Sequence, residues 1–500
     1  MKTTLSLSAP AQIETECLAV VVLDRSEKDR GADQKPELSV ETSDAAVRDA
    51  VAEVIGSGEV SGKMFETNLL HRPAKLRARR LLLLGGGKAK TFGSSDLRKL
   101  AGTAARFLKP KGIRTFAFLA PEGIPGEEAV AAIVEGVFVG NFDPDTYKSD
   151  RKDQAMEAVT VVTRGDQALL QKAMDEARIV GESQNFTRDL VNEPSNRMTP
   201  SILAERARKM AQEVGLKCEV YGADKIKELK MGAFWGVAQG SDEPPALIVL
   251  RYEPAGAPSN PVLGLVGKGI TFDTGGISIK PADGMEKMKY DMAGGAAMIG
   301  AMRGIALLKP KVKVIAVICA TENMPSGKAQ KPGDVQIAMS GKSIEIINTD
   351  AEGRLILADG LCYARQLGCT HLVDAATLTG AVVVALGYVN AGIFASDDQM
   401  YDRFASASQQ AGEKLWRLPL DDEYKEIIKS GIADMVNSGG RWGGAITAAM
   451  FLKEFAEDTP WIHLDIAGTA CTEEQKPWIA KGPSGIALRS LVEFVKSWSA

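Results

Sequence analysis

Two carboxylates and a guanidinium occupy alternate positions in the stretch NTDAEGRLILADGL, residues 348–361: Asp350, Glu352 and Arg354. The run SIEIIN before them has the pattern of a strand, and the segment after them has helical spacing. Acidic residues at the junction between a strand and a helix can cap the helix, lie in a solvent-exposed turn or bind a polyvalent cation. These residues alone leave the three alternatives open.

Further charged residues follow apolar runs in the second half of the chain. The run PVLGLVG leads into Lys268 and Asp273, and Lys280 and Asp291 come shortly before a helical segment. Ligands of open α/β sheets bind beyond the carboxyl ends of strands, so the acids are expected to converge. Four converging carboxylates repel one another unless cations neutralise them, and their charge matches two divalent ions. The pattern favours a metal site that accepts Mg, Mn or Zn, without naming a reaction.

Composition narrows the class of protein. The 500 residues exceed the usual limit of one core, and 45% apolar and 25% charged residues are typical of a soluble globular protein. A net charge of −4 gives no general reason to expect nucleic-acid binding. No secretory signal or membrane span is recognised, and six scattered cysteines without a CxxC pair predict reduced thiols in a cytoplasmic protein. Three distant histidines make a zincin site improbable, so a metal site must use carboxylates.

The alternation of apolar runs predicts three parts. Residues 1–165 are expected to form an α/β domain, with the run from Cys17 to Leu23 as its first strand, and residues 166–195 a connecting helix. Residues 196–500 are expected to form a larger α/β domain, because continuous Val/Ile-rich runs suit strands buried on both faces of a parallel or mixed sheet. The predicted strands of this second domain are 246–252, 261–267, 311–320, 343–348, 371–377 and 461–468.

Three other patterns in the sequence are weaker. The stretch LLLLGGGKAKTFGSSDL (81–97) predicts a tight turn between a strand and a helix rather than a phosphate loop, because it lacks GxGxxG. Gly341-Lys342-Ser343 is no P-loop, because Gln336 replaces the required glycine. The basic cluster HRPAKLRARR (71–80) is either a nucleic-acid patch or a solvated face, and the solvated face is favoured.

The stretches VGKGITFDTGGISIKPADGMEKMKYDMAGGAA and NTDAEGRL closely resemble the leucyl aminopeptidase (cytosol aminopeptidase) family, bacterial type. LVNEPSN, DAATLTGA and HLDIAGTA extend the resemblance over roughly residues 190–490. The resemblance implies a macro-like N-terminal α/β domain followed by a catalytic α/β domain with a central mixed sheet covered by helices. It also implies an enzyme that releases leucine and other apolar N-terminal residues from peptides by attack of a metal-bridging water.

The resemblance also implies roles for individual residues. Asp273 and Glu352 are expected to be shared by two ions, manganese or zinc. Asp350 is expected to complete the looser site, and Lys268 and Asp291 the tighter one, which requires a neutral Lys268. Lys280 is expected to stay protonated and polarise the scissile carbonyl, and Arg354 to hold a bicarbonate ion that acts as general base.

The pocket for the first side chain is inferred from the same resemblance. Its expected lining residues are Met288, Thr377, Ala467 and Ala470, and the backbone N–H of Leu378 is expected to face the substrate. Met288 could equally be ordinary core packing. The family's usual assembly, a homohexamer built as a dimer of trimers, is a further expectation.

Two other enzyme classes remain as alternatives to this resemblance. A two-metal phosphoesterase is the stronger one, because carboxylates with a lysine and an arginine also suit phosphate. A serine or cysteine hydrolase is weaker, because the sequence has no GxSxG and no histidine near a candidate nucleophile.

Overall fold

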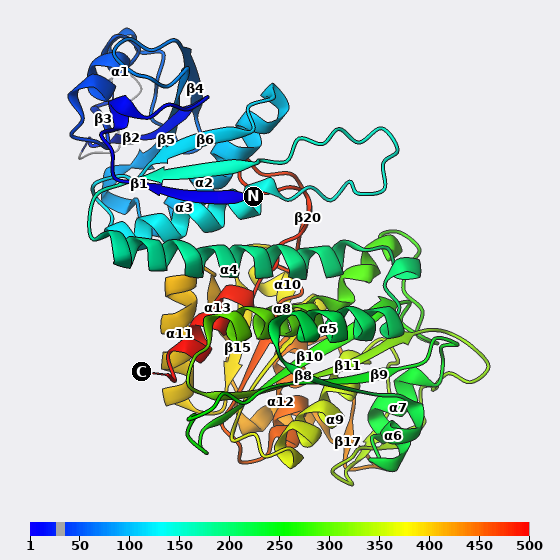
Figure 1. Ribbon diagram of the computed structural model, residues 1–500. Helices are drawn as coiled ribbons and strands as arrows, with labels where there is room; N and C mark the ends of the chain where they lie inside the picture. The colour runs from blue at the N-terminus through cyan, green and yellow to red at the C-terminus, as the bar shows by residue number, and fades with distance from the viewer. Residues whose placement is uncertain (27–35, 500) are drawn as a thin grey trace. The chain divides into compact units, whose positions relative to one another are not determined.

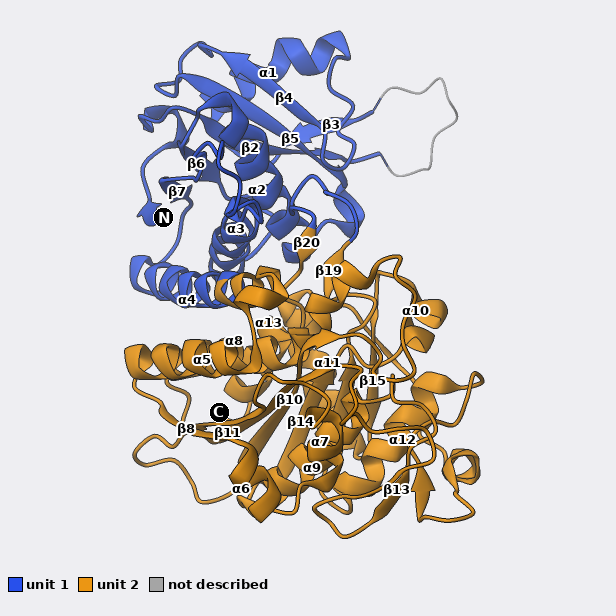
Figure 2. Ribbon diagram, turned by 90° about the vertical axis from the view of Figure 1, so that its right-hand side faces the viewer, with its two compact units in different colours: residues 1–185, 473–481 blue, residues 186–472, 482–500 orange. Residues whose placement is uncertain are grey.

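The computed structural model describes residues 1–26 and 36–499. The chain divides into two compact units, residues 1–185 with 473–481 and residues 186–472 with 482–500 (Figure 2). The division falls inside α4 (Gln167–Asn192), the long helix expected within 166–195. The nine residues 473–481 belong to the first unit although they come late in the sequence. The predicted domain boundaries at 165 and 195 stay predictions.

The first unit is built on a mostly parallel sheet with the strand order β1-β7-β6-β2-β5-β4, to which β3 is added beside β2. Only β3 and β4 run antiparallel to their partners. The strands are β1 (Lys2–Ser6), β2 (Leu18–Asp24), β3 (Leu38–Val40), β4 (Thr67–His71), β5 (Arg80–Lys88), β6 (Thr115–Leu119) and β7 (Ala158–Val162). The helices are α1 (Ala45–Ser57), α2 (Ser94–Leu108), α3 (Gly126–Asn141) and the first part of α4.

Both faces of this sheet are buried, as its continuous apolar runs predict. Along β2, Ala19 and Val21 pack with α2, α3 and α4, whereas Val20 and Val22 pack on the opposite face with α1. Successive side chains of a strand point to opposite faces, so an unbroken apolar run can fill two cores at once.

Two expectations for the first unit are wrong in detail. The run that begins at Cys17 forms the second strand, because the more polar stretch Lys2–Ser6 pairs with β7 at the sheet edge. The glycines at 85–87 form no turn but continue β5. A side chain at Gly85 would lie 2.1 Å from the Lys63 carbonyl oxygen, so glycine is needed there for a close backbone approach.

The second unit contains a mixed sheet of eight strands in the order β16-β15-β18-β14-β10-β11-β9-β8. The four strands in the order β18-β14-β10-β11 are parallel to one another. The strands are β8 (Lys217–Tyr221), β9 (Ala246–Tyr252), β10 (Val262–Asp273), β11 (Lys313–Asn323), β14 (His371–Ala376), β15 (Ala391–Ala395), β16 (Leu415–Arg417) and β18 (Trp461–Asp465).

Helices cover both faces of the mixed sheet. Figure 1 shows α5 and α8 on one side of the sheet and α7, α9 and α12 on the other. The helices of this unit are α5 (Pro200–Val214), α6 (Ala223–Glu228), α7 (Gly232–Ala238), α8 (Ala293–Leu308), α9 (Gly353–Gln366), α10 (Gly380–Leu386), α11 (Asp398–Ala411), α12 (Gly444–Ala456) and α13 (Leu488–Lys496). The expected helix-covered mixed sheet is confirmed.

One apolar helical stretch, Met285–Leu308, combines a 3-10 segment with α8. Among the described residues it alone has the length and composition to cross a membrane, and most of it is buried inside the structure. Glycines let α8 approach the sheet closely: a side chain at Gly294 would lie 2.0 Å from the Ala375 carbonyl oxygen.

The strand expected at 343–348 is shorter than predicted and lies outside the mixed sheet. It is β13 (Ser343–Glu345), which pairs with β12 (Val335–Ile337) and β17 (Met435–Val436) in a separate small sheet. Seven residues, 346–352, then lead into α9 in turn, bend or irregular conformation. The stretch NTDAE is therefore an irregular loop before a helix and not the end of a central strand, and the Gly353-Arg354 pair that follows it begins α9.

Candidate metal centre

The parallel strands of the mixed sheet end at one edge, and polar side chains gather there. β10 ends at Asp273, β11 at Asn323 and β18 at Asp465, while Thr377 follows β14 directly. The loop before α9 brings Asp350 and Glu352 to the same place. This is the position where open α/β sheets bind ligands.

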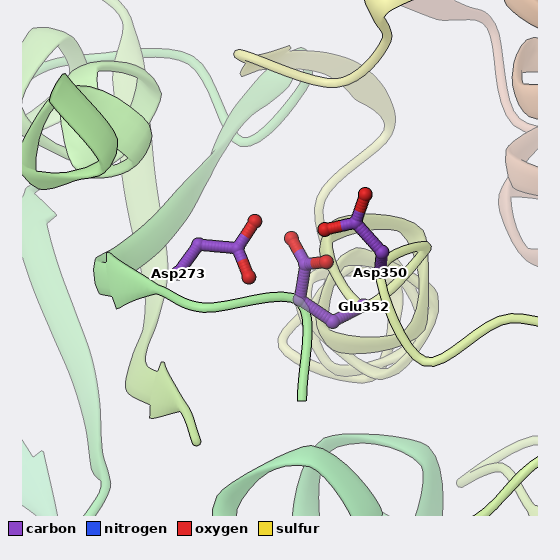
Figure 3. Close-up of side chains that lie close together, drawn as sticks. All are labelled: Asp273, Asp350 and Glu352. Carbon is purple, nitrogen blue, oxygen red and sulfur yellow. The ribbon is translucent and has the colours of Figure 1, made fainter. Parts of the chain in front are cut away.

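Three carboxylates converge at this edge. One oxygen from each of Asp273, Asp350 and Glu352 lies within 4.8 Å of the other two. Figure 3 shows the three side chains pointing toward one another from a strand end and from the loop before α9. Asp273 and Glu352 are buried, and Asp350 is half-buried. Asn323 donates from Nδ2 to Asp273 Oδ1 (2.8 Å) and to Glu352 Oε2 (3.4 Å), which holds two of the acids in place.

The two predicted lysines bridge the acids in pairs. Lys268 Nζ lies 2.8 Å from Asp291 Oδ2 and 2.8 Å from Glu352 Oε1. Lys280 Nζ lies 2.8 Å from Asp273 Oδ2 and also forms an ion pair with Asp350. All six predicted lysines and acids are therefore part of one connected cluster, as their expected convergence requires. Gly353 makes room for Lys268, because a side chain there would lie 2.7 Å from Nζ.

Electrostatics show that this cluster holds more negative charge than its surroundings neutralise. Burial and the neighbouring acid Asp273 raise the pKa of Glu352. Burial raises the pKa of Asp291 well above its usual range, although Lys268 opposes the shift. Burial disfavours both ammonium groups, but the surrounding carboxylates outweigh it and raise the pKa of Lys268 and of Lys280. Four acids with two ammonium groups leave a surplus of acid, which is what divalent cations would relieve.

Arg354 lies in the first turn of α9 and is buried. Its Nη1 donates to the Asn437 carbonyl oxygen (2.8 Å), and its Nε has no hydrogen-bond partner in the structure. Burial lowers the pKa of this guanidinium to about 10, while Glu352 and Asp465 raise it. A buried guanidinium with a free N–H is suited to binding a small planar anion.

Most of the residues predicted to line the first side-chain pocket lie in the loops after β14 and β18. Thr377 Oγ1 donates to Asp291 Oδ1 (2.7 Å), and the Thr377 carbonyl oxygen accepts from Lys268 Nζ (2.9 Å). Ala467 is half-buried and Ala470 is buried. Met288 is half-buried in the 3-10 segment before α8.

The prediction for Leu378 needs a correction. Its backbone N–H donates to Asp465 Oδ1 (3.1 Å), so this hydrogen points to a buried carboxylate and is not directed at a substrate. The residue nevertheless lies at the cleft described next.

A cleft of about 620 Å³ adjoins the cluster. Asp350, Arg354 and Leu378 line it, together with Trp442 and Val384. Trp442 is 77% exposed and Val384 is 90% exposed. The cleft is large enough to admit part of a peptide beside the carboxylates.

Sequence reasoning missed two side chains at this edge. Asn323 bridges two acids of the cluster, and Asp465 accepts hydrogen bonds from the loop after β14. Both end apolar runs, in KVIAVICATEN and WIHLD, so reading each strand to its last residue would have identified them. Asparagine, lacking charge, gave no signal by residue type.

The basic cluster 71–80 lies in the first unit, between β4 and β5. Lys75 pairs with Asp49 (2.9 Å) with both side chains largely exposed, and Arg80 donates from Nη1 to the Glu16 carbonyl oxygen (3.3 Å). Its proposed nucleic-acid contact stays a prediction.

Comparison with known proteins adds independent information. The cytosol aminopeptidase family matches the chain twice, with its catalytic domain at residues 185–492 and its N-terminal domain at residues 19–151. The chain is 62% identical to a probable cytosol aminopeptidase of Koribacter versatilis (strain Ellin345) and 58% identical to one of Acidobacterium capsulatum. Both alignments cover all of this chain and all of the relative.

Solved structures show the same architecture. A tomato leucine aminopeptidase, in a mutant form, superposes with a TM-score of 0.88 at 33% identity over 99% of this chain and 96% of that chain. The bottromycin maturation enzyme BotP in complex with Mn superposes with a TM-score of 0.84 at 32% identity, over 97% of this chain and 100% of that one. The matched domains, the full-length relatives and the shared fold show that this chain belongs to the cytosol aminopeptidase family and is an aminopeptidase, a hydrolase of peptides.

Proposed function

We propose that the protein is a two-metal aminopeptidase that releases leucine and other apolar residues from the N-termini of peptides. The observation that carries this proposal is the buried convergence of Asp273, Asp350 and Glu352 within 4.8 Å at the carboxyl edge of the mixed sheet. Oxygen ligands of this kind suit Mn and Zn, and a similar solved structure was determined with Mn.

The arrangement of the cluster suggests which residues bind each of two metal ions. We assign Asp273 and Glu352 as shared ligands, Asp350 as the further carboxylate of the looser site, and Lys268 with Asp291 as the ligands of the tighter site. Bound divalent ions would supply Lewis-acid activation of a water and of the substrate carbonyl. Lys268 can coordinate only as a neutral amine, so metal loading is coupled to release of its proton.

Lys280 and Arg354 act on the reacting groups in this proposal. Lys280 keeps its proton among the acids and donates to the scissile carbonyl oxygen, where negative charge develops. Arg354 holds a bicarbonate ion as general base, which its unpartnered buried Nε supports. Met288, Thr377, Leu378, Ala467 and Ala470 are assigned to the pocket for the first side chain. Apolar members at these positions favour leucine and similar residues.

Peptide substrates need a free amino group in this proposal. A neutral α-amine can coordinate a cation, whereas an acetylated one cannot do so usefully. We also propose a cytoplasmic location, supported by the family name of the relatives, and assembly as a hexamer arranged as a dimer of trimers. Large exposed apolar side chains such as Trp416 and Trp442 support burial of surface in an assembly.

The deciding experiment is hydrolysis of leucine p-nitroanilide by the purified protein, after EDTA treatment and again after addition of Mn²⁺ or Zn²⁺. N-acetyl-leucine p-nitroanilide serves as the matched blocked substrate. We expect activity to vanish with EDTA, to return with metal and to be absent on the blocked substrate. Full activity after complete metal removal would overturn the metal assignment, and hydrolysis of both substrates would overturn the requirement for a free amine.

A further inference from the structure

Asp465 lies completely buried at the end of β18, beside the end of β14. Its Oδ1 accepts from the backbone N–H groups of Leu378 (3.1 Å), Thr379 (3.4 Å) and Ala467 (3.3 Å). Its Oδ2 accepts from Thr379 Oγ1 (2.7 Å). One carboxylate thus ties the loop after β14 to the loop after β18, and these loops carry most of the residues assigned to the first side-chain pocket.

The loop that Asp465 holds continues directly into the carboxylate cluster. Thr377, the residue before Leu378, accepts from Lys268 Nζ (2.9 Å) through its carbonyl oxygen. Its hydroxyl donates to Asp291 Oδ1 (2.7 Å). The path from Asp465 to Lys268 therefore runs through the one peptide group that joins Thr377 to Leu378: its N–H donates to Asp465, and its carbonyl oxygen accepts from Lys268.

A buried, hydrogen-bonded group lies next to Asp465 on the same two strands, β14 and β18. Asp374, on β14, accepts from Trp461 Nε1 (2.6 Å) and shares a hydrogen bond with His463 Nδ1 (2.6 Å). The His463 ring stacks between Phe394 and Trp461, with centroid distances of 5.7 and 6.1 Å. Burial raises the pKa of Asp465, and the neighbouring His463 and the hydrogen bonds from the loop oppose that shift. A fully packed base of this kind leaves the carboxylate little freedom to move.

We propose that Asp465 is a positioning residue for the aminopeptidase reaction: it fixes the loop 377–379 against Ala467, and through Thr377 it orients Lys268 and Asp291. The inference rests on the roles proposed above for these two ligands. Partners of metal ligands typically change metal affinity or activity by about 10–100-fold when they are removed. Asp465 acts one residue further out, so we expect a loss near the lower end of that range.

A carboxylate suits this task better than a neutral amide. All four groups that reach Asp465 are donors, and an ionised carboxylate only accepts. Asparagine has nearly the same shape but offers one acceptor oxygen, and its NH₂ group would face a donor. Asp465→Asn therefore removes at least one of the four hydrogen bonds while the side-chain volume is kept.

The test compares Asp465→Asn with wild type by three readouts: Mn²⁺ affinity of the metal-free protein by calorimetry, kcat and KM for leucine p-nitroanilide, and the ratio of kcat/KM for leucine over alanine p-nitroanilide. We expect Mn²⁺ binding to weaken about tenfold, kcat/KM to fall at least tenfold, and the leucine preference to shrink. Thr379→Val removes the hydroxyl donor and is expected to act in the same direction, and Thr379→Ser is expected to restore most of that loss.

Asp359→Asn is the matched control. Asp359 is a fully buried carboxylate of the same unit that accepts from the N–H groups of Phe234 (2.8 Å) and Met339 (2.7 Å), and it does not contact the cluster. It is expected to lower the unfolding temperature without changing the leucine-to-alanine ratio or Mn²⁺ affinity. If Asp465→Asn does not fold, the Thr379 pair decides the question.

The possible results distinguish a failure of the proposed role of Asp465 from a failure of the proposed two-metal function. A folded Asp465→Asn protein with wild-type Mn²⁺ affinity, kcat/KM and selectivity would overturn the positioning role and leave the metal site intact. The same pattern of loss in Asp359→Asn would also overturn it, because it would reveal a general effect of destabilisation. A wild-type protein that binds no Mn²⁺ or Zn²⁺ would instead overturn the proposed two-metal function itself.

Discussion

At the scale of single residues, the different roles assigned to Lys268 and Lys280 can be tested most directly. Both are held between carboxylates, but Lys268 is buried, whereas the Lys280 side chain is 21% exposed. This difference agrees with the proposed assignment, in which Lys268 serves the tighter site and Lys280 acts on a bound peptide. The same residue type thus has two assigned protonation states, neutral on metal loading for Lys268 and charged for Lys280.

Lys280→Ala should retain Mn²⁺ binding but lose about 10²–10³-fold in kcat, the usual effect of removing one donor to a developing oxyanion. The measurements are calorimetric Mn²⁺ titration and steady-state kinetics on leucine p-nitroanilide. Lys328→Ala, at an exposed position of the same unit, is the control and should behave as wild type. Loss of Mn²⁺ in Lys280→Ala would show that its role is to hold the acids together.

Asp359 provides a pH prediction at the same scale. Burial raises its pKa from 3.8 to about 7, against the opposing hydrogen bonds from Met339, Phe234 and Ala233. Because the pKa in the folded state lies above that in the unfolded chain, the contribution to stability is complete below about pH 3.8 and is lost as pH rises through about 7. The free energy of unfolding of wild type, minus that of Asp359→Asn, should therefore decrease between pH 5 and pH 8.

Urea unfolding of both proteins across this range measures the difference directly. A pH-independent difference would show that Asp359 has the same protonation state throughout the range. A difference that increases with pH would contradict a raised pKa of Asp359 in the folded protein.

At the scale of elements, close packing of α8 on the mixed sheet positions the carboxylate cluster of the candidate metal centre. Asp291 and Met288 lie in the 3-10 segment that leads into α8, and Thr377 follows the strand beneath it. Small residues in the first turn allow this approach. Gly294 faces the Ala375 carbonyl oxygen and Gly295 faces Gly269. The distance between helix and strand therefore controls how Asp291 meets Thr377.

Gly294→Ala should push α8 away from β14, because its new methyl carbon would lie 2.0 Å from the Ala375 carbonyl oxygen. Overpacking of this kind typically costs about 1–3 kcal/mol, to be measured by urea unfolding. Gly56→Ala in α1 is the control, because no heavy atom lies within 4 Å of the added carbon. That change should stabilise the first unit by about 0.5–1 kcal/mol. Equal effects at both sites would refute the packing argument.

At the scale of the whole molecule, the metal centre is expected to be a source of stability for the second unit. The cluster connects β10, β11, the segment before α8 and the loop before α9, which are far apart in the sequence. Cations that bind the folded protein and not the unfolded chain shift unfolding by mass action. Relief of the repulsion between the acids adds to this effect.

Mn²⁺ at a hundred times its dissociation constant should stabilise the metal-free protein by about 2.7 kcal/mol, seen as a rise in unfolding temperature by calorimetry. Glu352→Ala removes a ligand assigned to both ions and should abolish most of the rise together with activity. A rise in unfolding temperature of equal size in Glu352→Ala would place the stabilising ion elsewhere.

Measurement of the molecular mass in solution tests the assembly, for which six chains are expected.

Much of the centre could be read from the sequence. An apolar run that leads into charged residues identified Asp273, the stretch before a helical segment identified Asp291, and the stretch NTDAEGRL identified Asp350, Glu352 and Arg354. The continuous apolar runs of β2, β10 and β11 predicted strands buried on both faces. These features are local, because a residue's place at the end of an element depends on its immediate neighbours and on hydrophobic periodicity.

The tertiary structure decided which strand ends meet. The order of the strands places β14 between β10 and β18, although about a hundred residues separate β14 from β10 along the chain, and no local pattern encodes that order. In the tertiary structure, Asn323 lies between two acids and the Leu378 N–H donates to Asp465. The strand β13 lies in a separate small sheet. The sequence by itself determined the family and the chemistry of the acids, whereas long-range packing decided which side chains support them.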